Sequence, residues 1–134
     1  MDEKLFWQLL VTFVVAIVGW WVAHWLTSKR DVENERRKLR ITYLIEAYRR
    51  LESASHAADP KSKYPALESA IADIQLLGTS RQVTLARAFS NEMALHRTAS
   101  IDELLADLRD SLRVELRLEP VSEKIVHLRF KDEP

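Results

Sequence analysis

Apolar residues dominate the first part of the chain. From Leu5 to Leu26 there is no Asp, Glu, Lys or Arg, and a helix needs about 20 predominantly apolar residues to cross a bilayer. Indole rings favour the two membrane–water interfaces. The tryptophans lie near the two ends of this run, at Trp7, Trp20, Trp21 and Trp25. The pattern therefore predicts a transmembrane helix within residues 1–28, in contact with membrane lipid.

Two other interpretations of the apolar run fit the sequence less well. A cleaved secretory signal has a basic start, an apolar core of about 7–15 residues and small residues at its end. Here the start is acidic on balance, the core is longer, and tryptophans occupy the end. A buried core helix is disfavoured because so small a domain could hardly surround an all-apolar helix of that length. We therefore expect a permanent anchor.

Basic residues are distributed unequally around the run. Lys4 alone precedes it, and six basic residues follow it closely. Cytoplasmic loops near a span carry an excess of Lys and Arg, so we expect a single-pass protein of the inner (plasma) membrane with its N-terminus outside and the rest in the cytoplasm. Lys29 and Arg30 are placed at the membrane interface with the tryptophans. The basic residues after the run are Lys29, Arg30, Arg36, Arg37, Lys38 and Arg40.

Beyond the apolar run the pattern becomes that of packed helices. Residues 29–40 are densely charged and lack Gly and Pro, which predicts a juxtamembrane helix that continues from the span. From Ile41 onward, apolar residues recur at three- and four-residue intervals in four successive stretches. The residues expected to face inward are Ile41, Leu44, Ile45, Tyr48, Leu51, Leu67, Ile71, Ile74, Leu77, Val83, Phe89, Leu104, Leu105, Leu108 and Leu112.

Local signals predict where these helices begin and end. The first helix should end within 53–56, and 57–63 should be a loop. Pro65 is expected at the first position of the second helix, and Gly78 in a left-handed conformation after it. The third helix is expected to run to about Leu95. Capping boxes should start the third and fourth helices, at Thr79 with Gln82 and at Ser100 with Glu103.

The last part of the chain has a different pattern. Apolar and polar residues alternate from Val114 to Leu118 and again from Val126 to Phe130, which is typical of strands. A pair of terminal strands and a helix followed by an extended tail are both consistent with it. We favour the tail, because the fourth helix already accounts for the periodicity up to Leu112.

Composition supports a helical fold, since only two glycines and four prolines interrupt the chain. The expected fold class is all-α: a single N-terminal transmembrane helix continuous with a small cytoplasmic bundle of about four helices, and an extended C-terminal tail. The expected divisions are an anchor (1–28), a charged juxtamembrane helix (29–40), a helical bundle (41–118) and a tail (119–134).

The sequence carries no catalytic signature. It has no cysteine, and Gly19 and Gly78 are its only glycines, which excludes thiolate chemistry and a glycine-rich phosphate loop. Glu92 and His96 are one turn apart, but no further ligand is visible nearby. We therefore expect a non-enzymatic protein without catalytic residues, cofactor or metal.

The remaining ionisable residues are interpreted as having no catalytic or metal-binding role. His24 lies at interface depth, where a neutral, hydrogen-bonded imidazole is expected. His56, His96 and His127 are interpreted as single histidines without convincing partners. The acidic residues of the fourth helix are expected on a solvated face, with Asp110 paired to Arg113.

We expect the protein to act by binding other proteins rather than by catalysing a reaction. With 20 basic and 20 acidic residues the chain is neutral, so nucleic acid is not an expected partner. We expect an adaptor or a small regulatory subunit of a membrane assembly that self-associates, with Gly19 and Ala23 as a helix–helix contact. The alternative is an oligomeric, holin-like or membrane-depolarising effector. Candidate residues for contact with a protein partner are Val126, Leu128 and Phe130.

Overall fold

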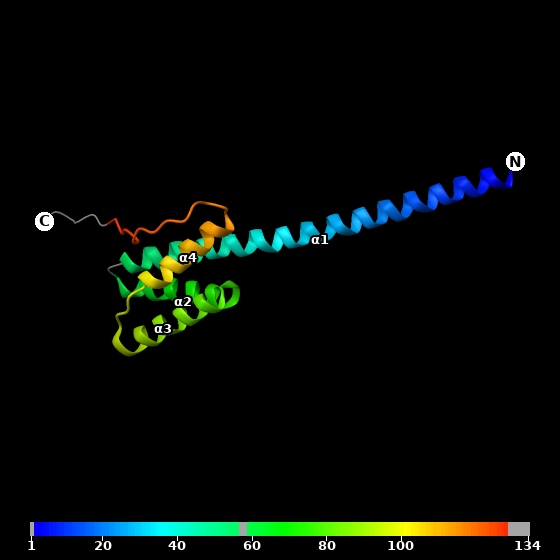
Figure 1. Cartoon of the computed structure of the whole chain (residues 1–134). Helices are drawn as coiled ribbons and strands as arrows, with labels where there is room; N and C mark the ends of the chain where they lie inside the picture. Colours follow the sequence, from blue (N-terminus) through cyan, green and yellow to red (C-terminus); the bar gives the residue numbers. More distant parts are fainter. Residues whose placement is uncertain (1, 57–58, 129–134) are drawn as a thin grey trace. The chain divides into compact units, whose positions relative to one another are not determined.

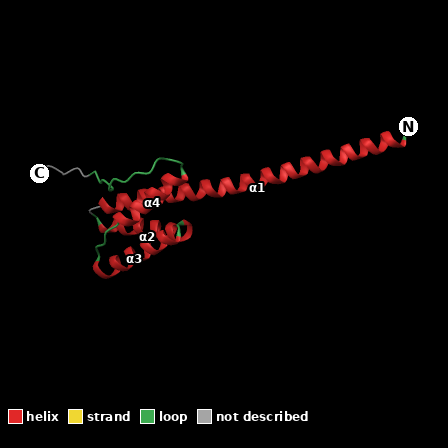
Figure 2. Ribbon diagram, in the orientation of Figure 1, coloured by secondary structure: helices red, strands yellow, loops and turns green. Residues whose placement is uncertain are grey.

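The computed structural model describes residues 2–56 and 59–128, and all regular secondary structure within these ranges is α-helical. The helices are α1 (Glu3–His56), α2 (Pro60–Leu77), α3 (Ser80–His96) and α4 (Asp102–Glu115) (Figure 2). The expectation of an all-α protein is confirmed. Up to residue 128 no strand is formed, so the alternating residues after α4 do not pair as strands there.

The chain divides into two compact units, Met1–Lys38 and Leu39–Pro134, and α1 contributes residues to both. In the first unit every side chain from Asp2 to Lys38 is exposed. By length and composition, α1 contains a stretch able to cross a membrane, and none of that stretch is buried by the protein.

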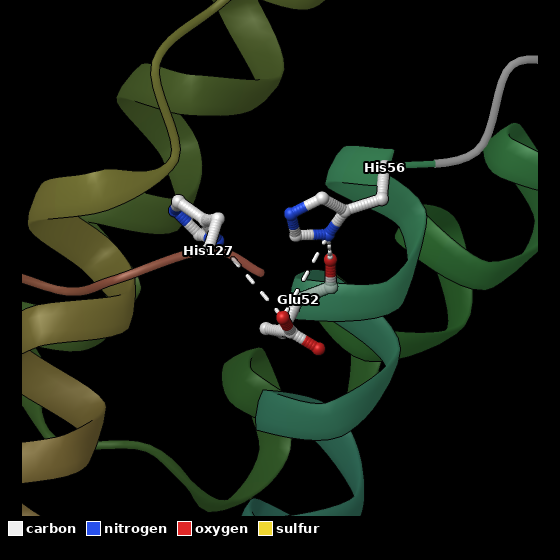
Figure 3. A group of neighbouring side chains, drawn as sticks. All are labelled: Glu52, His56 and His127. Atoms are coloured by element: carbon white, nitrogen blue, oxygen red, sulfur yellow. Dashed lines mark hydrogen bonds and ion pairs between the residues drawn. The ribbon is translucent and has the colours of Figure 1, made fainter. Parts of the chain in front are cut away.

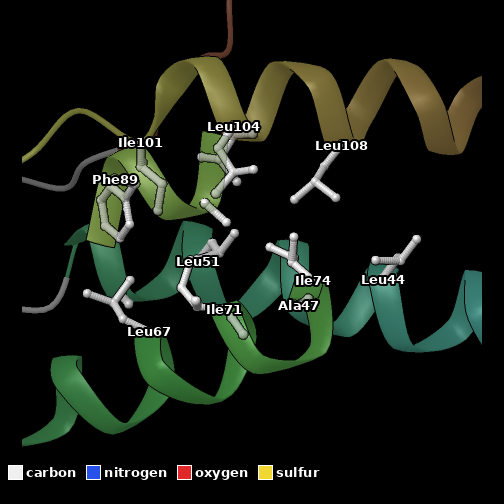
Figure 4. Close-up of a cluster of buried hydrophobic side chains, with 14 of the residues drawn as sticks. Leu44, Ala47, Leu51, Leu67, Ile71, Ile74, Phe89, Ile101, Leu104 and Leu108 are labelled. Carbon is white, nitrogen blue, oxygen red and sulfur yellow. The ribbon is translucent and has the colours of Figure 1, made fainter. Parts of the chain in front are cut away.

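The second unit has one hydrophobic core to which all four helices contribute. Leu51, Ile74 and Leu108 (Figure 4) are completely buried in it, and so is Leu105. Every residue predicted to face inward is buried or half-buried. The sequence analysis did not include two alanines in the second unit's part of α1, Ala47 and Ala54, which are as buried as the leucines. Their small side chains allow neighbouring helices to approach closely.

Two arginines of α1 form polar contacts with α2. Arg50 forms an ion pair with Asp73 at 2.5 Å and also donates to the Ser69 hydroxyl. Arg40 donates from Nε to the carbonyl oxygen of Leu77 at 2.9 Å, at the C-terminal end of α2. A cation there satisfies a terminal carbonyl and complements the helix dipole. Arg40 therefore takes part in packing, although the sequence pattern grouped it with the charged stretch.

The start of α2 differs from the prediction. The helix begins at Pro60, so residues 60–63 are helical rather than loop, and Pro65 lies inside the helix. The physical reason is the cap: the Asp59 carboxylate accepts a hydrogen bond from the Lys61 amide at 3.0 Å. Proline is well suited to the first helical position because its missing N–H has no helical partner there.

Gly78 ends α2 in a way the sequence did not predict. Its backbone is extended, with φ −73° and ψ 166°, rather than left-handed. A Cβ atom added at this position would lie 2.5 Å from the Ile74 carbonyl oxygen and 3.2 Å from Cβ of Gln82. Glycine is therefore required because a side chain would collide with the last turn of α2 and crowd the first turn of α3, and not for a positive φ.

The two predicted capping boxes have opposite outcomes. The box of Thr79 and Gln82 is confirmed: the Gln82 amide donates to the Thr79 hydroxyl, and the Thr79 amide donates to Oε1 of Gln82. The box at Ser100 is wrong, because Ile101 precedes α4 with helical φ and ψ and no side chain caps the helix. Ile101 is buried in the core, so packing of its side chain sets the entry to α4.

Residues 116–128, which we call the C-terminal segment, run antiparallel to α4 (Figure 1). Arg113 donates to the Glu119 carbonyl oxygen at 2.7 Å. One turn earlier in α4, Arg109 donates to the carbonyl oxygens of Glu123 and Val121, at 2.8 and 3.3 Å. Arginine side chains thus satisfy backbone acceptors that a strand partner would satisfy in a sheet.

Candidate membrane segment and histidine cluster

The predicted interface residues lie on exposed positions of α1. All four tryptophans are more than half exposed. Nζ of Lys29 lies 3.8 Å from the centroid of the Trp25 ring, a cation–π contact. The rings of Trp20 and His24 stack with centroids 5.7 Å apart. At this end of the apolar run, aromatic and basic groups therefore lie on adjacent turns, while Trp7 lies near the other end.

Polar side chains within the run and directly after it are partly satisfied by the helix itself. The hydroxyls of Thr12 and Thr27 donate to the carbonyl oxygens of Gln8 and Ala23, each at 2.9 Å. Such bonds within the helix lower the cost of a hydroxyl in lipid, where no water is available.

Gly19 and Ala23 lie one turn apart on the exposed helix. A Cβ added to Gly19 would meet nothing within 4 Å. The position is therefore open, and a second helix could approach the backbone closely there.

The second unit contains a cluster that the sequence analysis missed. Glu52 and His56 lie one turn apart on α1, and His127 reaches them from the C-terminal segment (Figure 3). The His56 and His127 rings contact each other with centroids 4.8 Å apart. The expectation that these two histidines lack partners is therefore wrong. The spacing of Glu52 and His56 was a local signal, but tertiary structure alone brings His127 to them.

In each of the two imidazoles, one ring nitrogen has a hydrogen-bond partner and the other has none among the described residues. Nδ1 of His56 lies 2.6 Å from the Glu52 carbonyl oxygen and 3.0 Å from the Ser55 hydroxyl. Nε2 of His127 lies 3.1 Å from Oδ1 of Asp102. Nε2 of His56 and Nδ1 of His127 are buried and have no hydrogen-bond partner among the described residues. Oε1 of Glu52 lies 3.9 Å from Nδ1 of His127.

Tyr48 lies one turn before Glu52 on α1 and is half-buried. Burial raises the pKa of its hydroxyl above the usual value, with an opposing effect from Arg109 and a smaller contribution in the same direction from Glu52. The phenol therefore stays neutral at physiological pH and adds no charge near the cluster.

The acidic residues of α4 have partners other than those expected. Asp110 pairs with the adjacent Arg109 at 2.9 Å, and not with Arg113, whose guanidinium is turned to Glu119. Asp107 pairs with Arg81 of α3 at 2.8 Å. The other pair considered in the sequence, Glu92 and His96, is exposed on α3 and does not belong to the histidine cluster.

The predicted partner-contact residues are only partly described. Val126 is 87% exposed and Leu128 is 75% exposed, whereas Ile125 and His127 between and beside them turn toward the protein. Phe130 lies outside the described residues. The C-terminal segment therefore covers part of the helices with one set of side chains and presents apolar side chains outward with the other.

Comparisons with known proteins identify no relative. No protein-family model, curated protein or solved structure matches the chain.

Proposed function

We propose that the chain is a bitopic protein of the inner membrane whose cytoplasmic unit, Leu39–Pro134, holds a protein partner at the membrane without catalysis, as an adaptor or a small regulatory subunit. In this proposal the four helices form a small bundle and residues 119–134 form its tail. Trp7, Trp20, Trp21, Trp25, Lys29 and Arg30 anchor the span at the two interfaces.

One observation carries the membrane part of the proposal: the uncharged run Leu5–Leu26 is exposed along its whole length in the folded chain. The core helix of a soluble protein would be largely buried, and this helix is not. Water would hydrate a continuous apolar surface only at a large cost in free energy, which lipid removes. The basic residues that follow the run support a cytoplasmic second unit.

The contact role rests on the outward side chains of the C-terminal segment. Val126 and Leu128 are exposed apolar residues on backbone that Arg109 and Arg113 hold in place nearby. An anchored apolar contact costs less conformational entropy on binding than a free tail would. Gly19 and Ala23 supply a second contact, between the spans of two copies.

The first arm of the test concerns location. Full-length protein with a C-terminal epitope should stay in the membrane pellet after carbonate extraction, because an apolar span is not released by alkali. The epitope should resist protease added to intact cells and be digested once the membrane is opened. Release into the supernatant, removal of residues 1–28 from the mature protein, or digestion in intact cells would contradict the proposal.

The second arm concerns contact. Crosslinking in native membranes followed by affinity purification should recover a self-associated form and at least one other protein. Val126→Asp with Leu128→Asp should reduce recovery of that protein, whereas Val114→Asp, a change at an exposed apolar residue of α4, should not. Depolarisation of the membrane on expression, with no protein recovered, would instead favour the pore-forming effector.

A further inference from the structure

Glu52, His56 and His127 form a group of metal-binding side chains from two distant parts of the chain. A ligand atom of each residue lies within 4.8 Å of a ligand atom of the other two. All three side chains are partly buried rather than free in solvent. The hydrogen bonds around them decide which nitrogen of each imidazole is available to a ligand.

For His56, the available atom is Nε2. The contact of 2.6 Å between Nδ1 and the Glu52 carbonyl oxygen requires a hydrogen on Nδ1, because a carbonyl oxygen only accepts. In the neutral ring the lone pair then resides on Nε2. This atom is buried without a hydrogen-bond partner among residues 2–56 and 59–128, and an unpaired polar atom in such a place is costly.

For His127, the same reasoning gives the other nitrogen. The Asp102 carboxylate accepts from Nε2 at 3.1 Å, which leaves the lone pair of the neutral ring on Nδ1. Nδ1 is buried, lacks a hydrogen-bond partner within the described part of the chain, and lies 3.9 Å from Oε1 of Glu52. That separation is too long for a hydrogen bond.

The outer hydrogen bonds match those of metal-binding histidines. Such histidines donate their second ring N–H to a backbone carbonyl or a carboxylate, which fixes the tautomer and the ring orientation. Here Glu52 supplies the carbonyl for His56, and Asp102 supplies the carboxylate for His127. The group therefore offers two imidazole lone pairs without a hydrogen-bond partner, on Nε2 of His56 and Nδ1 of His127, and the carboxylate of Glu52. Oε1 of Glu52 lies 3.7 Å from Nδ1 of His56 and 3.9 Å from Nδ1 of His127, and a cation held by the two lone pairs and the carboxylate would satisfy all three.

We propose that Glu52, His56 and His127 bind a single zinc ion and that this ion fastens the C-terminal segment to α1. Two imidazoles and one carboxylate form a common protein ligand set for zinc, with the fourth position left to water. Zinc ligands lie about 2.0–2.2 Å from the ion, so the three side chains close in on it when it binds. A cavity of about 300 Å³ is lined by His127, its partner Asp102 and Ser55, next to His56 in the sequence.

The test is zinc titration of the full-length protein, purified in detergent without a polyhistidine tag and stripped of metal with a chelator. We expect one zinc ion per chain by calorimetry and the visible absorption of tetrahedral cobalt when Co²⁺ replaces it. Zinc should also raise Tm and slow proteolysis within residues 116–134, because binding stabilises the folded form only.

The variants separate the proposed site from other histidines. His56→Gln and His127→Gln should weaken zinc binding by at least about 100-fold, and Asp102→Asn by about 10–100-fold, as for outer-sphere partners. His96→Gln, at an exposed histidine of α3, should change nothing. Circular dichroism of each variant without metal checks that the helices remain.

Two results would overturn the inference. One is the absence of saturable 1:1 zinc binding by the well-folded protein. The other is binding that His56→Gln and His127→Gln leave unchanged while His96→Gln weakens it, which would place the ion on the surface of α3.

Discussion

At the scale of single residues, the environment of a side chain decides its role more often than its type does. Gly78 and Gly19 are the two glycines of the chain, yet an added Cβ would meet backbone and side-chain atoms at the first and open space at the second. His96 is exposed, whereas His56 and His127 share a partly buried cluster. Sequence reasoning gave all three histidines the same interpretation, because a residue's tertiary neighbours are not visible in a linear sequence.

The contrast between the glycines gives a prediction. Gly78→Ala should lower the free energy of unfolding of the second unit by about 1–3 kcal/mol, because overpacking forces backbone or side chains to shift. Gly19→Ala should leave it unchanged. Thermal unfolding of both variants in detergent measures this, and an unchanged Tm for Gly78→Ala would show that the last turn of α2 and the side chain of Gln82 can shift without cost.

At the scale of helices, periodicity predicted the buried faces well and the ends less well. All residues expected to face inward are at least half-buried, since burial of apolar area drives the docking of each helix. The helix ends depend on single hydrogen bonds that compete with packing. Asp59 and Pro60 start α2 earlier than expected, and Ile101 displaces Ser100 from the start of α4.

The two predicted capping residues, Thr79 and Ser100, can be compared by the same substitution. Thr79→Ala should cost about 1 kcal/mol of stability, because it removes a side-chain bond to an otherwise unpaired amide of α3. Ser100→Ala should cost little, because no side chain caps α4. Chemical denaturation of both variants would reveal the difference, and equal losses would mean that Ser100 does cap α4 in solution.

At the scale of the whole molecule, the two units have different requirements. The first needs only an uninterrupted apolar surface, whereas the second needs a core closed by four helices. A substitution that destroys the core should therefore leave membrane insertion intact. This separation follows from what drives each process: transfer of one helix into lipid in the first unit, and mutual burial of side chains in the second.

Leu105 tests this separation. It is completely buried, so Leu105→Asp places an unpaired charge in the core at a cost of several kcal/mol, a large part of the roughly 5–15 kcal/mol that stabilises a typical domain. The variant should remain in the carbonate-resistant membrane fraction while its second unit becomes sensitive to protease. Leu95→Asp, at a residue that is 78% exposed, should behave as the parent protein does. Loss of Leu105→Asp from the membrane would show that insertion depends on the folded unit.

The sequence by itself determined the features that depend on local order: the helical class, the apolar run, the buried faces and the capping box at Thr79. Periodicity and capping involve residues within a few positions of one another, so a linear sequence contains them in full. Tertiary structure alone decided the close approach at Gly78, the antiparallel course of residues 116–128 and the meeting of His127 with Glu52 and His56. His127 is distant in sequence from Glu52 and His56, so only the shared core brings them together. The contacts at Gly78 and along residues 116–128 join groups closer in sequence, but their geometry depends on how the helices pack.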